Sequence, residues 1–154
     1  MTESFLKSWK FKVFLIRQLP LGLLVGLKIK EVDNTSCSVS VPFKWLNKNP
    51  FQSMYFAVQS MAAEMSTAIL SFTAINKNEN SIAFIIVGMQ SNFLKKATRK
   101  VTFKCADGHK VEEAISECIQ TKKAVTKTFK TIGTQSDGTV VAEFFFTWSY
   151  KLRS

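Results

Sequence analysis

The segment from Gln52 to Phe72 has the clearest helical pattern in the chain, because it is rich in Met and Ala and contains neither Gly nor Pro. Its only side chain expected to carry a charge is Glu64. A helix on a protein surface normally carries several charged residues on its outer side. The pattern therefore predicts a long helix that is largely enclosed by the rest of the protein.

Strands are predicted on both sides of this helix, where apolar and polar residues alternate or a short apolar run is bounded by turns. They cover residues 25–32, 37–41, 82–89, 101–105, 124–132 and 140–150, with turns at 76–80 and 136–138. Residues 3–17 and 109–120 have helical spacing, and Pro20 and Gly22 end the first of these two helices. One long helix held against an antiparallel sheet is an α+β arrangement. We expect a single domain over residues 1–154, with residues 1–19 as an N-terminal helical extension.

In the last predicted strand, one face is more apolar than the other, because side chains alternate between the faces of a sheet. We expect that face to cover the helix; it carries Val140, Ala142, Phe144, Phe146, Trp148 and Tyr150.

Steps of 100° along the long helix separate two stripes of side chains. The first is apolar and suits the sheet: Met54, Val58, Met61, Met65, Ala68 and Phe72. The second consists of small side chains with one carboxylate: Ser53, Ala57, Ser60, Glu64, Thr67 and Ser71. Small side chains allow close approach, so we expect a second subunit or a substrate to contact this stripe.

A lone carboxylate in such a place loses hydration, so we expect the pKa of Glu64 to be raised. A raised pKa prepares a carboxylate as a general base or a nucleophile. The alternative is a structural Glu64 that is bonded to a serine or a backbone amide. Asn49 also allows two interpretations: with Pro50 it suits the start of a helix, and otherwise its amide faces the same cavity.

The composition indicates a globular protein, since apolar residues make up 46% and charged residues 21% of the sequence. The high count of 14 Phe requires a large core, a subunit interface or an apolar ligand cavity. The net charge of +10 favours an anionic partner, such as nucleic acid, anionic lipid or the phosphates of coenzyme A. The basic residues are scattered and no arginine-rich arm is present, so nucleic acid is disfavoured.

Three cysteines without Cys-x-x-Cys spacing indicate neither a disulfide framework nor a zinc site, and they favour a reducing cytoplasm. The apolar stretch 11–27 is interrupted by Lys12, Arg17 and Pro20, which excludes its insertion across a membrane. The only histidine is His109, in a predicted turn. This shortage disfavours a histidine-ligated metal site, Ser-His or Cys-His catalysis, and dehydratase chemistry.

The stretch from Asn49 to Glu64 resembles the helix entry of hotdog-fold thioesterases of the phenylacetate-pathway type. That family has an Asn, then His-Gly-Gly six residues later, and an acid nine residues after the His. Asn49 falls on the Asn, Tyr55-Phe56-Ala57 on His-Gly-Gly and Glu64 on the acid. The segment Asn92-Phe93-Leu94-Lys95-Lys96-Ala97 is similar to the family's Asp-Phe-Leu-Arg-Pro-Gly segment. The chain also resembles an uncharacterised branch of hotdog proteins.

The resemblance implies a hotdog fold, in which an antiparallel sheet wraps a long central helix and subunits pair edge to edge as a homodimer or a tetramer. It implies a thioesterase that hydrolyses an acyl-CoA or carrier-protein thioester at the subunit interface, with coenzyme A as part of the substrate and no further cofactor. Glu64 would be the base or nucleophile, and Asn49 would orient the carbonyl or the attacking water. The remaining residues expected to bind substrate are Phe56 and Ala57 through their amides, Ser60 and Thr67 on the small stripe, and Lys95, Lys96 and Arg99 at the phosphates.

The sequence departs from the family where Tyr-Phe-Ala replaces His-Gly-Gly, since glycines permit close backbone approach and Phe56 could crowd a ligand. Loss of catalysis would leave an acyl- or acyl-CoA-binding protein, which is the main alternative. A third possibility is an interaction module for nucleic acid or membrane, whose binding would be salt-sensitive and indifferent to thioesters.

Overall fold

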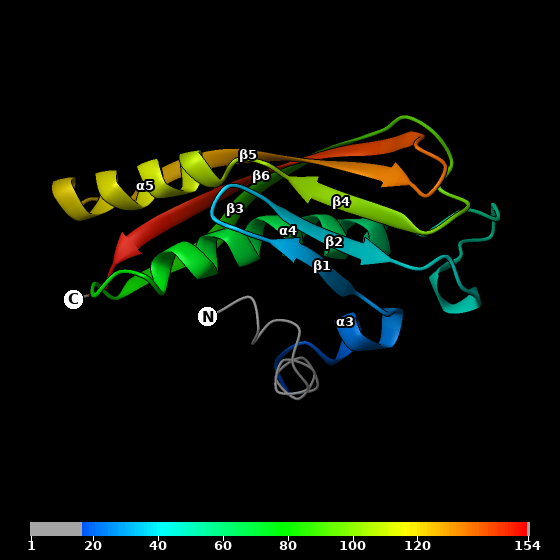
Figure 1. Cartoon of the computed structure of the whole chain (residues 1–154), viewed down its shortest axis with the longest axis horizontal. Coiled ribbons are helices and arrows are strands. Elements are labelled where there is room, and N and C mark those ends of the chain that lie inside the picture. The colour runs from blue at the N-terminus through cyan, green and yellow to red at the C-terminus, as the bar shows by residue number, and fades with distance from the viewer. Residues whose placement is uncertain (1–16, 154) are drawn as a thin grey trace.

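The computed structural model describes residues 17–153 and contains one six-stranded sheet in which all neighbouring strands are antiparallel. The strand order is β1-β2-β4-β5-β6-β3. The strands are β1 (Lys28–Val32), β2 (Cys37–Val41), β3 (Ile82–Phe93), β4 (Val101–Cys105), β5 (Val125–Gln135) and β6 (Val140–Leu152). Figure 1 shows the strands running along the long axis of the molecule.

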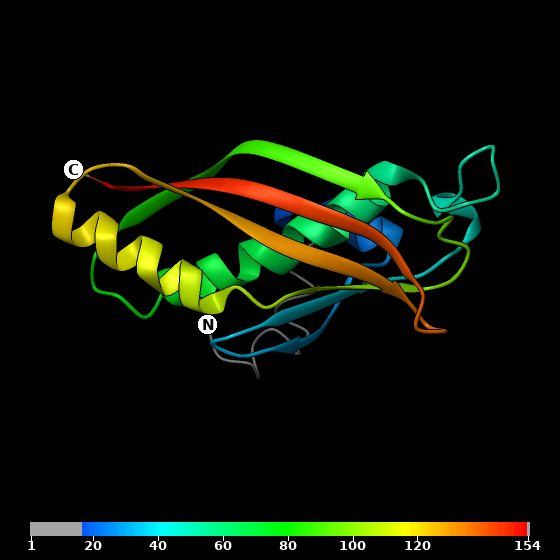
Figure 2. The same cartoon turned by 90° about the horizontal axis from the view of Figure 1, so that it is seen from above.

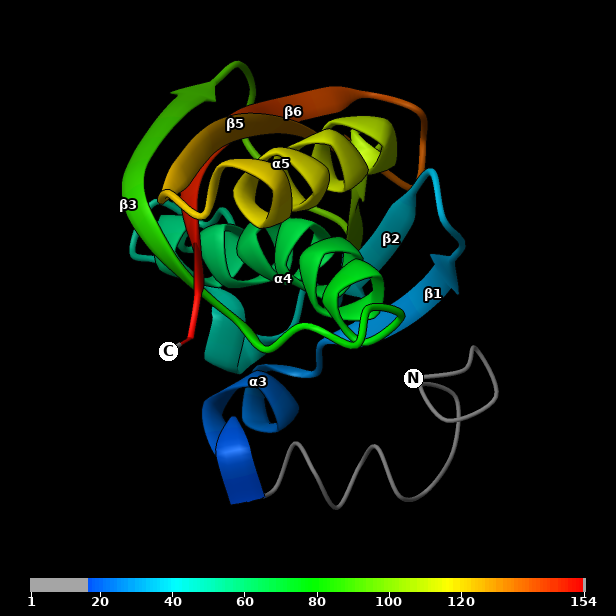
Figure 3. The same ribbon diagram turned by 90° about the vertical axis from the view of Figure 1, so that its left-hand side faces the viewer.

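The central helix α4 (Phe56–Ile75) lies inside the curve of this sheet. Figure 3 shows the sheet passing from β3 over β6 and β5 to β2 and β1, with α4 enclosed. A shorter helix, α5 (Gly108–Thr121), packs against β5, β6 and α4. Figure 2 shows α5 at one end of the long axis, while α3 (Pro20–Val25) lies in the other half of the molecule. A 3-10 turn, η1 (Trp45–Asn47), follows β2. The predicted α+β hotdog fold is confirmed.

The alternation in β6 explains how the sheet holds the helix. Ala142, Phe144, Phe146, Trp148 and Tyr150 are buried, as predicted, and the side chains between 143 and 149 on the other face are partly exposed. Burial of so many aromatic side chains is the main favourable contribution to the stability of this core.

The side of α4 that faces the sheet is more polar than the sequence predicts. Thr67 Oγ1 accepts a hydrogen bond from Trp148 Nε1 at 3.0 Å, and Ser71 Oγ bonds Tyr150 Oη at 2.6 Å. Met61 and Ala68 are instead partly exposed. The predicted assignment of the two stripes is wrong at these positions, because the sheet supplies polar partners that make buried hydroxyl groups favourable.

The N-terminal boundary of the sheet also differs from the prediction. The chain forms α3 up to Val25, and Gly26 then adopts a left-handed conformation with φ of 86° before β1 begins at Lys28. Glycine adopts this conformation without a steric cost. The predicted helix over residues 3–17 lies almost wholly outside the described residues.

No helix between residues 17 and 153 combines the length and apolar character required to cross a membrane.

Candidate functional site

A cavity of about 590 Å³ opens where the chain enters α4. One wall is the loop before the helix and the first turn of the helix, and the other is the segment that follows β3. The lining residues are Asn49, Pro50, Phe51, Ser53, Met54, Tyr55, Phe56, Gln59, Phe93, Leu94, Lys95, Lys96 and Ala97. The Asn49 segment and the lysine segment, which the resemblance assigns to one site, thus line the same cavity.

Backbone hydrogen bonds fix both walls of the cavity. Met54 N donates to Ala97 O at 2.7 Å, which joins the two walls directly. Leu94 N donates to Val141 O at 2.8 Å and ties the lysine segment to β6. The cavity is therefore a preformed part of the fold, and most of its lining is aromatic or aliphatic.

The N-terminus of α4 has no side-chain cap. Val58 N and Gln59 N donate to Tyr55 O, whereas the N–H groups of Phe56 and Ala57 make no hydrogen bond within residues 17–153. Free N–H groups and the helix dipole favour a negative charge at this position. Of the two predicted amide donors, Phe56 lines the cavity and Ala57 is the next residue on the helix.

Asn49 organises the loop that leads into α4. Its Oδ1 accepts hydrogen bonds from Phe51 N at 3.0 Å and Ser53 N at 3.2 Å, and its Nδ2 donates to Ser53 Oγ at 3.1 Å. The helix begins at Phe56, so Asn49 does not cap it, although the sequence favoured that interpretation. Asn49 closes a turn instead, and this turn holds its amide in the cavity wall.

Glu64 is partly buried and lies on the more exposed side of α4, with Met61 and Ala68. Its side chain makes no hydrogen bond or ion pair with the described residues 17–153, and burial raises its pKa from 4.5 to about 7. The expected rise in pKa is therefore supported by the geometry. Glu64 is not among the residues that line the cavity. Eight helical residues separate it from Phe56, which corresponds to about 12 Å along the helix axis.

The other residues predicted on the small stripe have separate roles in the structure. Ser60 is partly exposed and its Oγ donates to Phe56 O at 3.0 Å. Thr67 is fully buried; its hydroxyl donates to Glu64 O at 2.8 Å and accepts from Trp148. Both hydrogen-bonding capacities of Thr67 are thus used inside the protein, and neither residue lines the cavity.

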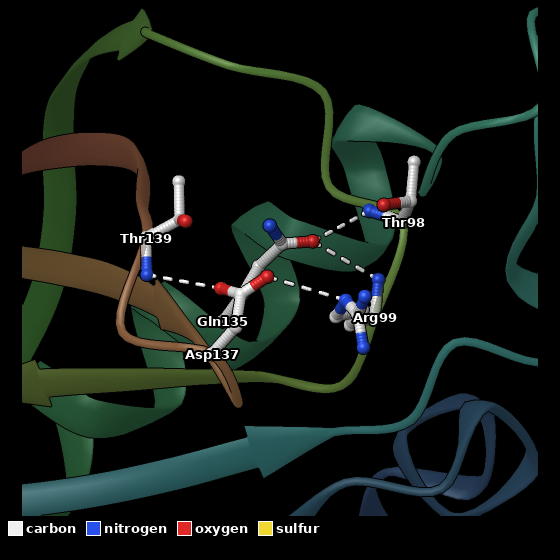
Figure 4. Close-up of polar contacts among 5 residues, drawn as sticks. All are labelled: Thr98, Arg99, Gln135, Asp137 and Thr139. Atoms are coloured by element: carbon white, nitrogen blue, oxygen red, sulfur yellow. Dashed lines mark hydrogen bonds and ion pairs between the residues drawn. The ribbon is translucent and has the colours of Figure 1, made fainter.

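Of the predicted basic residues, Lys95 and Lys96 are exposed and line the cavity, whereas Arg99 does not. Arg99 Nε forms an ion pair with Asp137 Oδ2 at 3.2 Å, and Gln135 Oε1 accepts hydrogen bonds from the backbone of Thr98 and Arg99 (Figure 4). Arg99 therefore joins this loop to the β5–β6 hairpin.

Sequence analysis missed Gln59, which is buried and lines the cavity. The sequence did contain a signal for Gln59. It is a long amide side chain that lies outside both predicted stripes, in a helix of mostly small or apolar residues.

Replacing Glu64 by Gln is expected to stabilise the protein at pH 8 and to leave its stability at pH 5 nearly unchanged. The folded protein binds the Glu64 proton more tightly than the unfolded chain, so stability falls as pH rises from about 4.5 to about 7. Glutamine cannot ionise and avoids this loss, which is on the order of 2 kcal/mol for a partly exposed group. Denaturant unfolding at both pH values measures the effect, and an equal difference at pH 5 and pH 8 would contradict the raised pKa.

Comparisons with known proteins complete the description of the site. A family model described as "Domain of unknown function (DUF4442)" matches residues 7–150. No curated protein matches the sequence.

Several solved structures are similar to the chain. A Pseudomonas aeruginosa protein of unknown function, named a probable thioesterase, is 16% identical, with a TM-score of 0.78 over 95% of this chain and 97% of that chain. A Chlorobaculum tepidum protein of unknown function is 13% identical, with a TM-score of 0.79 over 94% and 93%. A thioesterase from Haemophilus influenzae is 12% identical, with a TM-score of 0.65 over 95% and 93%. These similarities establish the fold.

Proposed function

Since the chain belongs to the family described as Domain of unknown function (DUF4442), we propose its function from its own site: it hydrolyses acyl-CoA thioesters. The observation that carries this proposal is Glu64, a desolvated carboxylate with a pKa raised to about 7 and no partner within residues 17–153. It lies on the helix whose uncapped N-terminus opens onto an apolar cavity. Similar structures that are named thioesterases support the same reaction class.

The proposed reaction uses the charge distribution around α4. Glu64 takes a proton from water while the water oxygen bonds to the thioester carbonyl carbon. The N–H groups of Phe56 and Ala57 stabilise the oxyanion, and Asn49 orients the carbonyl or the water. The carbon–sulfur bond then breaks, and the proton on Glu64 passes to the leaving thiolate. Direct attack by the Glu64 carboxylate, followed by hydrolysis of the anhydride, uses the same groups.

A homodimer completes the proposed site. Glu64 does not line the cavity that holds Asn49 and Phe56, so one subunit does not bring the three groups together. One edge of the sheet is β3, whose Ile85 and Val87 are 66% and 57% exposed. Pairing of β3 with the same strand of a second copy would bring the more exposed side of each α4 toward the other subunit. Glu64 of the partner subunit would then approach the cavity. A tetramer would require a second interface.

Charge reversal at Lys95 and Lys96 is expected to weaken coenzyme A binding about tenfold, since each lysine lies at the cavity and would meet phosphate. Calorimetry measures the affinity. The Lys104→Glu/Lys151→Glu variant changes two exposed lysines outside the cavity by the same charge and is the matched control. Equal affinities for the two double variants would remove the phosphate assignment.

The experiment that tests the proposed function is a chain-length panel of acyl-CoA thioesters, assayed for thiol release with wild type and Glu64→Gln. We expect turnover by wild type on part of the panel and almost none by the variant. Equal rates for the two proteins would exclude Glu64 as the working group.

A non-catalytic acyl-CoA-binding protein is the second candidate, because Phe56 packs edge-on against Tyr55 and Phe93 at the entry to the helix. Tyr55 and Phe56 fall where the thioesterase family that the sequence resembles has His-Gly. Tight binding of an acyl-CoA without turnover by wild type would establish this alternative.

A further inference from the structure

Gln59 is a buried amide in the wall of the cavity. The residue is 4% exposed, and its Nε2 donates a hydrogen bond to Met54 O at 3.2 Å. Its Oε1 is buried and makes no hydrogen bond with any of residues 17–153. The side chain thus carries an unused acceptor on a residue that lines the cavity.

The orientation of this amide is fixed by its neighbour. Met54 O is an acceptor, so only the NH₂ group of Gln59 can face it, and the Oε1 atom must lie on the other side. A buried acceptor without a partner is unfavourable, and a ligand that donates a hydrogen bond removes this cost. Two other buried side-chain atoms lack partners within residues 17–153, Asn47 Oδ1 and Thr73 Oγ1, and neither residue lines the cavity. Among residues 17–153, Gln59 is therefore the cavity-lining residue that carries an unsatisfied buried polar atom.

The position of Gln59 on α4 indicates which ligand group it meets. In the proposed reaction the thioester carbonyl lies at Phe56 N, three residues earlier, and three residues of helix rise about 4.5 Å. In a pantetheine thioester the nearest N–H donor is an amide on the thiol side, four covalent bonds from the carbonyl carbon. That separation matches the rise along the helix. The donor would approach from the mouth of the cavity, where Lys95 and Lys96 lie.

We infer that Gln59 Oε1 accepts a hydrogen bond from the amide N–H nearest the sulfur of the thiol, so that the site selects thioesters of pantetheine-type thiols. This inference rests on the proposed function and assigns the thiol side of its substrate. Gln59 contacts the leaving group in this arrangement and does not take part in proton transfer.

The test compares Gln59→Met with wild type on one acyl group carried by three thiols. Coenzyme A and N-acetylcysteamine both have the amide N–H, whereas butanethiol has none. We expect Gln59→Met to lower kcat/KM about tenfold for the first two thioesters, mainly through KM, and to change it less than twofold for the third. An equal loss on all three thioesters, or no loss on any, would overturn the inference.

A matched control and a binding measurement separate this inference from the proposed function. Thr73→Val removes another unpaired buried polar atom, outside the cavity, and should leave all three rates unchanged. Calorimetry with coenzyme A alone should show about tenfold weaker binding for Gln59→Met. Weaker binding in a protein that hydrolyses no thioester would refute the proposed function and leave this inference standing. Normal hydrolysis with unchanged Gln59→Met kinetics would refute only the inference.

Discussion

The Glu64→Gln variant is expected to hydrolyse acyl-CoA thioesters about 10³-fold more slowly than wild type, because a general base contributes about 10²–10⁴-fold to such reactions. Glutamine has nearly the same shape as glutamate and accepts no proton, so the loss reports the chemistry of the carboxylate. The matched control is Glu117→Gln, which neutralises an exposed glutamate that is paired with Lys127 on the outside of the protein. This control should retain wild-type rates.

The pH dependence of wild-type activity tests the same assignment. Burial raises the pKa of Glu64 to about 7, so the carboxylate is mostly protonated at pH 6 and mostly ionised at pH 8. A base must be ionised, and we therefore expect kcat/KM to rise about tenfold per pH unit below pH 7 and to level off above it. The residual activity of Glu64→Gln should lack this inflection. A wild-type profile that is flat between pH 5 and pH 8 would contradict the role of Glu64.

Patterns in the sequence predicted most elements of the fold. They failed where tertiary contacts determine where an element begins or ends. The bounds of β2 and β4 are those predicted, because apolar and polar residues alternate along each strand. The start of α4 was misplaced, since Pro50 suits a first helical position but Asn49 closes a separate turn with Ser53. Local preferences of Asn and Pro are similar for both structures, and the surrounding loop determines which of them forms.

The strand β3 was predicted too short for a related reason. Its pairing with β6 shifts register between Ile86 and Gly88, so a β-bulge changes which residues face inward. Apolar residues occur on both sides of this shift and form a continuous run, from which alternation cannot be read. After the bulge, Phe93 faces the same side as Ala142 and Phe144, and it lines the cavity.

The sequence could predict the part of the candidate site that a single chain forms. The resemblance to hotdog thioesterases assigned Asn49, Phe56, Lys95 and Lys96 to one site, and the structure has them around one cavity. In the proposed homodimer, the position of Glu64 relative to that cavity depends on the second subunit, which no pattern within one chain describes.

The Val87→Asp variant is expected to be monomeric and inactive. Val87 is 57% exposed at the middle of β3, so a single subunit can accept an aspartate there without losing core packing. In a two-fold symmetric dimer formed by antiparallel pairing of β3, residues near the centre of the strand meet their own copies. Two carboxylates would then face each other, and like charges directly opposite destabilise a sheet. Light scattering would measure the mass, and thiol release the activity.

The two edges of the sheet explain why β3 is the expected contact. The other edge, β1, has five residues and carries Lys28 and Lys30, and a short charged edge disfavours pairing between molecules. β3 has 12 residues and exposes apolar side chains, as a strand that pairs with a second copy requires. Val87→Thr keeps the branched shape without the charge and should remain a dimer with wild-type activity. A dimeric Val87→Asp would show that β3 does not form the interface, and a monomeric variant with full activity would show that one subunit holds the complete site.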